Sequence, residues 1–256
     1  MTKRNWNKAW IIGGSTGLGA AMVRELAHAG TEVIVSARNR ERLEECCKNY
    51  INATPLSLNV ANLNQCNQAV SMLLAKNGAL PDLIILNAAL YTPMNAQTLD
   101  PAECARMMDV NYQGAVNMFS ALITHKSDNK KVTVAAVTSP SGWRGLPGGA
   151  GYGPTKAAVI NLVESLKVEV EDQGFDLRLV NPGFIKTRLT DKNEFKMPQL
   201  MEPEYAAKKA LKGIASGKFD TSFPNPFIFY LKLLKHLPYR LYFRIMRKLV
   251  KKNETP

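Results

Sequence analysis

Short runs of apolar residues alternate along the chain with longer segments in which apolar residues recur at helical spacing. Runs of the first kind predict buried strands, and segments of the second kind predict helices with one face turned to a core. The predicted strands cover residues 9–12, 31–36, 54–60, 83–86, 131–138 and 175–180, and the predicted helices cover 18–29, 40–50, 63–76, 104–126 and 152–173. Strands that alternate with helices predict an α/β fold: a doubly wound (Rossmann) sheet, mostly parallel, with helices on both faces.

The C-terminal part of the chain follows a different pattern. Residues 219–223 predict a last strand, and residues 227–237 predict a strongly apolar helix that ends before a proline. In the helix that follows, one face carries the basic residues Arg240, Arg244, Arg247 and Lys251, and the opposite face carries Tyr242, Ile245, Met246 and Leu249. We therefore expect one domain over residues 1–225 and a basic amphipathic extension over residues 226–256.

Composition limits the class of protein. With 256 residues, 46% of them hydrophobic, the chain is long enough for one large α/β domain. It has no run of the ~20 apolar residues that a membrane-spanning helix needs. The apolar run behind its basic first residues ends at Gly13, so we expect no secretory signal. The four cysteines lack a CxxC spacing and the three histidines lie far apart, which predicts reduced thiols, no metal site and a cytoplasmic protein.

The net charge of +12 is concentrated in the C-terminal extension, where eight basic residues and one acidic residue follow position 226. A basic amphipathic helix with aromatic residues suits a membrane surface with anionic lipids, such as an inner membrane face. The same helix could instead pack on a neighbouring subunit or on its own domain, with its charges in solvent. No nucleic-acid recognition motif accompanies the charge, so we expect no nucleic-acid partner.

A cluster of glycines lies between the first predicted strand and the first predicted helix, with Gly13, Gly17 and Gly19 in a GxxxGxG spacing. Glycines at such a turn allow the backbone to approach a diphosphate closely, and the helix N-terminus behind them offers free N–H groups and a partial positive charge. The cluster predicts a dinucleotide site, although a merely tight strand-to-helix turn would need the same residues.

The end of the second predicted strand indicates which nucleotide would bind. An acidic residue at this place is typical of NAD sites, but the sequence here is Ser36-Ala37-Arg38-Asn39. A guanidinium suits a 2′-phosphate, with which it bonds in a forked geometry, and Ser15 in the glycine turn could assist. We therefore expect NADP(H) rather than NAD. The alternative is that Arg38 is a solvated residue at the start of the next helix.

Tyr152 and Lys156 stand four residues apart at the start of a predicted helix, a spacing that puts both groups on one face. A fixed positive charge lowers the pKa of a neighbouring tyrosine. The pair predicts an acid/base for a carbonyl or alcohol oxygen, although the spacing alone also fits a solvated helix flank. Asn87, Ser139 and Asn181 follow predicted strands, at the edge where open α/β sheets bind ligands.

Taken in order, these positions resemble the motifs of the short-chain dehydrogenase/reductase (SDR) family over roughly residues 8–225. The matched motifs are the glycine turn, an Asn-Ala pair, the catalytic tetrad, and the Pro-Gly and Thr of the nicotinamide end: Gly13, Gly17, Gly19; Asn87, Ala88; Asn111, Ser139, Tyr152, Lys156; and Pro182, Gly183, Thr187. Three positions depart from the family: Asn59 for a common Asp, Ala89 for a glycine and Pro154 for a small residue. None of them removes a catalytic group.

The resemblance implies an NADP(H)-dependent oxidoreductase that interconverts a ketone or aldehyde and an alcohol. In the reducing direction it gives Tyr152 the role of proton donor to the carbonyl oxygen and Ser139 that of hydrogen-bond donor to the same oxygen. It implies that Lys156 holds the nicotinamide ribose and that Asn111 holds a water. It also places four further residues against the cofactor: Leu18, Asn59, Val60 and Ile185.

Residues 188–202 fall where the family carries a variable substrate lid. Their apolar members could line a pocket or pack as ordinary core: Leu189, Phe195, Met197, Leu200 and Met201. Together with Trp143 from a bordering loop, Leu189 predicts an apolar substrate. The family also implies a homodimer or homotetramer. The alternative function is a non-catalytic nucleotide-binding scaffold that the basic extension recruits to a membrane surface.

Overall fold

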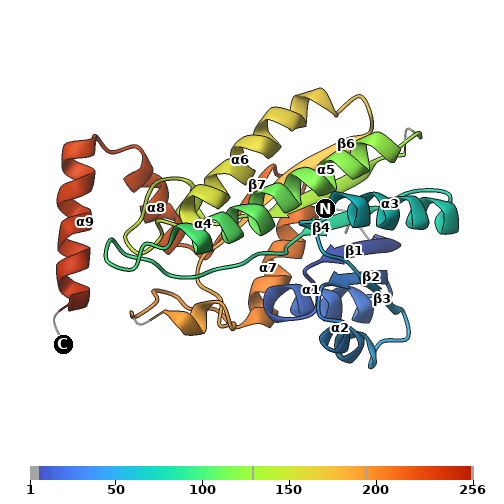
Figure 1. Ribbon diagram of the computed structural model, residues 1–256, viewed down its shortest axis with the longest axis horizontal. Helices are drawn as coiled ribbons and strands as arrows, with labels where there is room; N and C mark the ends of the chain where they lie inside the picture. Colours follow the sequence, from blue (N-terminus) through green and yellow to red (C-terminus); the bar gives the residue numbers. More distant parts are fainter. Residues whose placement is uncertain (1–5, 129, 194, 255–256) are drawn as a thin grey trace.

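The computed structural model describes residues 6–128, 130–193 and 195–254 of the chain. Seven parallel strands form one sheet in the order β3-β2-β1-β4-β5-β6-β7 (Figure 1). They are β1 (Lys8–Ile12), β2 (Glu32–Ala37), β3 (Ala53–Ser57), β4 (Leu83–Leu86), β5 (Val132–Val137), β6 (Phe175–Pro182) and β7 (Asp220–Phe223). The strand order reverses at β1, and in open α/β sheets this switch forms the binding crevice.

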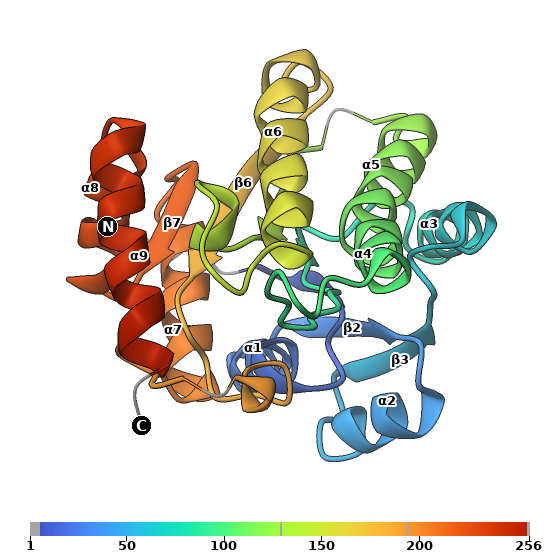
Figure 2. The same ribbon diagram turned by 60° about the vertical axis from the view of Figure 1, so that its left-hand side comes forward.

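Helices cover both faces of the sheet (Figure 2). One face carries α3 (Leu63–Asn77), α4 (Pro101–Met108), α5 (Gly114–His125) and α6 (Tyr152–Glu169), and the other carries α1 (Gly17–His28), α2 (Arg40–Cys47) and α7 (Pro203–Ala215). In β4 the side chains alternate between the two cores: Ile84 and Leu86 pack under the first group, and Leu83 and Ile85 under the second. The strand is buried on both sides, which is why its sequence is an unbroken apolar run.

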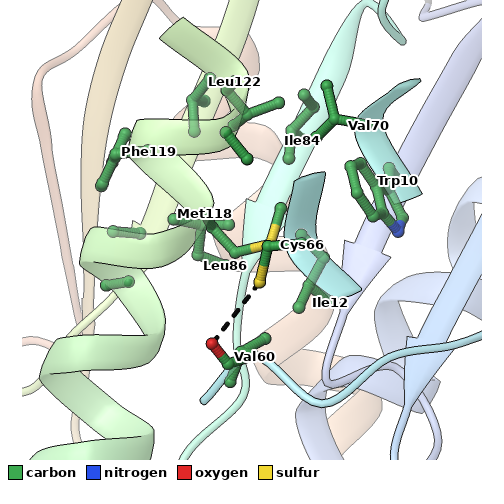
Figure 3. Packing of buried hydrophobic residues seen from close by; sticks show 14 of the residues in the cluster. Trp10, Ile12, Val60, Cys66, Val70, Ile84, Leu86, Met118, Phe119 and Leu122 are labelled. Carbon is green, nitrogen blue, oxygen red and sulfur yellow. Dashed lines mark hydrogen bonds between the residues drawn. The ribbon is translucent and has the colours of Figure 1, made fainter. Parts of the chain in front are cut away.

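Figure 3 shows the core between the sheet and helices α3 and α5. Side chains from β1 and β4 meet those from the two helices there, among them Trp10, Ile12, Ile84, Leu86, Cys66, Val70, Met118 and Leu122. Polar groups that enter this core find partners: the Cys66 thiol donates to the carbonyl of Val60, and the Trp10 indole N–H donates to Ser36 Oγ at 2.8 Å. This packing fixes the carboxyl ends of β1 and β4.

The predicted fold class is confirmed, but several predicted elements have different bounds; the predicted helices 40–50 and 152–173, for example, end at Cys47 and Glu169. The predicted helix 104–126 is interrupted, because the π-helical turn Asp109–Gln113 separates α4 from α5. A π-helical turn holds one extra residue in the hydrogen-bond ladder, which periodicity over a long window does not detect. The strand β3 ends at Ser57. The strand β6 extends to Pro182 because β7 pairs with its last residues, so Asn181 lies within the strand.

The last two helices, α8 (Phe227–Lys235) and α9 (Tyr239–Glu254), lie at one end of the molecule, beyond β7 (Figures 1 and 2). We call them the C-terminal pair. Ile228 of α8 is buried, and of the apolar face predicted for α9, Tyr242 and Met246 are buried, Ile245 is half-buried and Leu249 is 47% exposed. The face predicted for α9 is therefore turned to the rest of the domain only in part. Residues 1–5 of the predicted domain and the side chain of Lys251 lie outside the described residues. Within the described part of the chain, no helix is both long and apolar enough to cross a membrane.

Candidate active site

The glycine turn is held between two strands of the sheet. The backbone carbonyl of Ser36, in β2, accepts hydrogen bonds from the backbone N–H groups of Gly13, at 2.7 Å, and of Gly14, at 3.1 Å. From the other side, Asn87 donates its side-chain amide to the carbonyl of Gly13 at 2.8 Å. A Cβ on Gly19 would lie 2.1 Å from that same carbonyl oxygen, so no larger residue fits at this position. The turn is therefore rigid and closely packed.

The N-terminus of α1 is open to an outside acceptor. Its N-cap residue, Thr16, makes no side-chain capping bond, and no acidic residue lies in the first turn. The caps of α2, α3 and α4 differ, since Asn39, Asn62 and Asp100 each accept from a backbone N–H there. Uncapped N–H groups at the positive end of a helix are suited to a phosphate. The residues present therefore fit the diphosphate of a dinucleotide.

The residues predicted at the adenine end differ in exposure. Arg38 is exposed directly after β2, and Ser15 is half-buried in the glycine turn. The Asn59 side chain accepts from the N–H of Ala61 at 3.3 Å, so its oxygen is already used within its own turn. Val60, next to it, is buried under α5, where Gly114 leaves room for it. The structure leaves the guanidinium of Arg38 free to reach a ligand at the end of β2.

Tyr152 and Lys156 lie on the first turns of α6, at the carboxyl end of β5. The Lys156 ammonium is 5.5 Å from the centre of the Tyr152 ring and donates to the carbonyl of Val137 at 2.9 Å. Ser139, two residues after Val137, is half-buried, and its hydroxyl accepts from the N–H of Ser141 at 3.3 Å. The fold thus brings Ser139, Tyr152 and Lys156 to one edge of the sheet, as the sequence predicts.

Asn111 is buried in the π-helical turn and connects two parts of the site. Its side chain accepts from the N–H of Leu90 at 2.6 Å and donates to the Leu90 carbonyl at 2.9 Å and to Thr155 Oγ1 at 3.0 Å. Thr155 in turn donates to the carbonyl of Tyr152 at 2.7 Å. Asn111 and Lys156 are the two polar side chains that line a small, otherwise largely apolar cavity between the sheet and helices α5 and α6. Asn111 therefore fixes the loop after β4 to the start of α6.

The sequence matches the short chain dehydrogenase family over residues 7–198. An uncharacterized oxidoreductase of Myxococcus xanthus (strain DK1622) is 31% identical over 253 residues, which cover 97% of this chain and 100% of the relative. The 3-oxoacyl-[acyl-carrier-protein] reductase FabG of Rickettsia bellii (strain RML369-C) is 30% identical over 185 residues, or 72% of this chain and 75% of the relative. A solved short chain dehydrogenase from Burkholderia cenocepacia J2315 in complex with NADP shares the fold, with a TM-score of 0.82 and 23% identity over 96% of this chain and 99% of that one.

The chain belongs to the short-chain dehydrogenase/reductase family. It is an SDR oxidoreductase, and members of the family use NAD(P). The edge of the sheet where the predicted tetrad gathers is accordingly the candidate active site of this SDR.

The protonation of the Tyr152–Lys156 pair differs from the prediction. Burial raises the pKa of the Tyr152 phenol, and the nearby Tyr91 raises it further, so the lowering expected from Lys156 is not found. The physical reason is that desolvation of the phenolate outweighs attraction to an ammonium that is itself desolvated. Burial also lowers the pKa of Lys156 to about 8. At neutral pH the SDR therefore holds a protonated phenol beside a lysine that is still mostly charged.

The loop after β6 closes the site from the other side. Gly183 donates its N–H to the carbonyl of Phe223 at 2.7 Å, so β7 positions the Pro182-Gly183 motif. Thr190 then holds the loop in shape, because its hydroxyl donates to the carbonyl of Ile185 at 2.5 Å and accepts from the N–H of Thr187 at 2.9 Å. A Cβ on Gly17 would lie 3.0 Å from Thr187 Cγ2, which places the glycine turn against this loop.

The predicted substrate residues divide into two groups. Met201 is buried and pairs with Ile185 as a β-bridge, so for this residue the packing interpretation is correct and the pocket interpretation is wrong. Leu189 is half-buried, and Phe195 is 37% exposed and packs edge-on against Phe184 with ring centres 5.6 Å apart. These side chains remain available to a ligand.

Trp143 faces the C-terminal pair. Its ring lies 5.4 Å from the Lys232 ammonium and 6.0 Å from that of Lys235. The loop that carries the predicted catalytic serine therefore borders both the site and the C-terminal pair.

Tyr91 is a site residue that the sequence analysis missed. Its ring packs edge-on against the Tyr152 ring with centres 5.0 Å apart, and its hydroxyl donates to Asn193 Oδ1 at 2.6 Å. Lys192 donates to the Tyr91 carbonyl at 2.7 Å. These contacts tie the segment after β6 to the loop after β4, directly beside Tyr152. The partners stand about a hundred residues apart in the chain, so no local sequence pattern signals them.

Proposed function

We propose that this SDR is an NADP(H)-dependent reductase of ketones or aldehydes, or the reverse alcohol dehydrogenase, with Tyr152 as its acid/base. The observation that carries the proposal is the meeting of Ser139, Tyr152 and Lys156 at the carboxyl end of β5. Tyr152 is half-buried, and its raised pKa keeps the phenol protonated at neutral pH. A protonated phenol next to a charged ammonium can give a proton to an oxygen and tolerate the phenolate that results.

The chemistry divides between the cofactor and the chain. Bound NADPH would supply the hydride that reaches the carbonyl carbon. Tyr152 transfers its proton to the carbonyl oxygen, which completes the alcohol and leaves a phenolate. Ser139 donates a hydrogen bond to the same oxygen as negative charge develops on it. Lys156 stabilises the phenolate through its charge, and Asn111 keeps the start of α6 in place through Thr155.

The preference for NADP(H) rests on the end of β2. The residues there include the exposed Arg38 and no acid, and Asn39 is occupied as the cap of α2. A guanidinium binds a phosphate bidentately, whereas an acid at this place would repel it. The NADP-bound Burkholderia structure supports the choice only by its fold. We expect tighter binding of NADPH than of NADH, and loss of that difference in Arg38→Ala.

The test of the function is a screen of carbonyl compounds for NADPH oxidation, with wild type beside Tyr152→Phe. The panel contains apolar ketones and aldehydes and a 3-oxoacyl thioester, since FabG relatives are named for that substrate class. We expect turnover of at least one compound and a loss of about 10³-fold in the variant with NADPH binding retained. NADPH binding without turnover of any compound would contradict the proposal and favour a non-catalytic scaffold.

A further inference from the structure

Helix α8 turns a face of large aromatic and aliphatic side chains to solvent. Phe229, Tyr230 and Leu233 are 56%, 59% and 52% exposed, and their spacing puts them on the side of the helix opposite the buried Ile228. The rings of Phe229 and Tyr230 contact each other edge-on, with centres 5.9 Å apart. Large apolar residues scattered singly on a surface are ordinary, but three together on one helix face mark a contact surface.

Helix α9 adds an aromatic line beside a basic one. Tyr239 and Phe243 stack with ring centres 5.7 Å apart and are 71% and 50% exposed. By helical spacing they lie between the buried seam of Tyr242 and the stripe of Arg240, Arg244 and Arg247, whose residues are exposed. The order around α9 is therefore buried seam, exposed aromatic rings, then basic side chains.

The C-terminal pair is held firmly to the domain. The Arg144 guanidinium donates to the carbonyls of Leu234, Lys235 and Leu237, where α8 ends, at 2.9, 3.0 and 2.7 Å. It also lies 3.9 Å from the centre of the Tyr242 ring, and the Tyr242 hydroxyl donates to the carbonyl of Gly145. The exposed apolar residues are thus presented by a fixed structure.

Charge selects the kind of partner. The sequence from 227 to 250 contains Lys232, Lys235, Arg240, Arg244, Arg247 and Lys248 and no acidic residue. If a second copy of the chain docked with this same surface, the positive charges of the two copies would repel each other. A nucleic acid would match the charges but leave the exposed apolar rings without an apolar partner. An anionic bilayer matches both features, because its head groups attract the basic stripe and its interface accepts aromatic and aliphatic side chains.

We propose that the C-terminal pair is a docking surface for anionic lipid bilayers, with the rings of Phe229, Tyr230, Tyr239 and Phe243 in the interface and the basic stripe of α9 at the head groups. Neither helix of the pair is a candidate to span a bilayer, so the protein lies on the surface. The docking does not depend on turnover, and it would stand if the proposed function failed.

The test is flotation of the full-length protein with vesicles of phosphatidylcholine alone and of phosphatidylcholine with phosphatidylglycerol. We expect binding to the anionic vesicles and little to the neutral ones. The triple variant Phe229→Ser/Tyr230→Ser/Leu233→Ser should lose binding. The variant Arg240→Gln/Arg244→Gln/Arg247→Gln should weaken it about a hundredfold, because each basic residue near the surface contributes about a fivefold factor and the three factors multiply.

Matched control variants distinguish docking by this surface from nonspecific electrostatic or hydrophobic binding by the rest of the protein. Ile51→Ser/Met72→Ser/Val168→Ser removes exposed apolar residues elsewhere, and Lys76→Gln/Lys212→Gln/Lys218→Gln removes exposed charges elsewhere. Both should bind anionic vesicles like wild type, as should Tyr152→Phe. A thermal melt of each variant shows that its fold is retained.

Other results would overturn the proposal. The first is that wild type does not float with anionic vesicles, and the second is that wild type and the α8 variant bind them equally. The third is that wild type forms an oligomer through this surface and the α8 variant is a monomer. Tighter binding to duplex DNA or RNA than to vesicles would do the same. A depth measurement adds a direct readout, because bromine-labelled lipid tails quench the fluorescence of a tryptophan that enters the bilayer. In vesicles of such lipids, the quenched fraction of the tryptophan fluorescence should be larger for Phe229→Trp than for wild type, and Ile51→Trp should show no such increase.

Discussion

The α/β body and the C-terminal pair distribute apolar residues in opposite ways. In the body, the central strands β1, β4 and β5 are buried on both sides, and the large apolar side chains of β1 and β4 are almost fully enclosed. In the C-terminal pair, Ile228, Tyr242 and Met246 are buried, while most of the other large apolar residues are exposed. The body is therefore stabilised by its own core, and the pair by a few attachments. A substitution in the body should change the stability of the whole fold, whereas a substitution in the attachments should change the stability of the C-terminal pair alone.

The largest effect is expected at Lys156, where the body buries a charge for function. Lys156→Met should reduce turnover of the substrate found by the screen by about 10³-fold, since it removes the charge that stabilises the Tyr152 phenolate. The same variant should be more stable than wild type at pH 7, by about 2 kcal/mol, because a buried charge is replaced by an apolar chain. Enzyme assays and thermal melts of the two proteins measure both changes.

The pH dependence of this stability difference has a definite sign. The pKa of Lys156 is about 8 in the folded protein against an ordinary value of 10.5. Below pH 8 both folded and unfolded states hold the proton, and the folded state bears the full cost of the buried charge. Between pH 8 and 10.5 the folded state releases the proton first, so wild type gains stability relative to Lys156→Met. A variant that is less stable at pH 7, or a difference that does not shrink towards pH 10, would contradict this. Lys167→Met, half-buried on the same helix, is the control.

The second effect is steric and lies in the glycine turn. Gly19→Ala would place a methyl group 2.1 Å from the Gly13 carbonyl oxygen and 2.7 Å from Asn87 Nδ2. Neither atom can withdraw without breaking the hydrogen bond between them, so we expect the free energy of unfolding to fall by about 3 kcal/mol. We also expect the variant to lose NADPH binding. Denaturant unfolding and cofactor titration measure these losses. Gly145→Ala is the control, because a Cβ there meets no atom within 4 Å. Equal melting of both variants would show that the turn is not packed as described.

The order of strands and helices could be predicted from the sequence because buried strands and amphipathic helices carry local patterns. The same holds for Tyr152 and Lys156, whose relation is fixed by one helix, and for the glycine turn, whose residues are adjacent. Contacts between distant segments carry no such signal. Tyr91 meets Asn193 across 102 residues, and Arg144 meets the end of α8 across 90 or more. The change in the pKa of Tyr152 was mispredicted for a related reason, since burial is a property of the folded chain.

A third effect should be confined to the C-terminal pair. Arg144→Gln removes a charged donor shared by three carbonyls and also removes the contact with the Tyr242 ring. Together these interactions stabilise the attachment of the C-terminal pair by about 2 kcal/mol. Hydrogen exchange in α8 and α9 should therefore accelerate while the sheet stays protected. The melting temperature of the body should change little, and Arg144→Lys should restore part of the protection. Loss of protection throughout β1 and β4 would mean that the pair and the body form one cooperative unit.

The smallest effect concerns the link between the two loops of the site. Tyr91→Phe removes the hydroxyl that donates to Asn193 but keeps the ring that packs on Tyr152. We expect KM for the carbonyl substrate to rise about threefold with kcat nearly unchanged, since a hydrogen bond of this kind contributes about 1 kcal/mol and orders the segment after β6. Asn193→Ala should reproduce this result because it removes the other partner. Tyr91→Ala also removes the ring and should lower kcat as well. If Tyr91→Phe lowered kcat as much as Tyr91→Ala does, the hydroxyl would act in the reaction itself, and the division between a positioning contact and a packing contact at Tyr91 would be wrong.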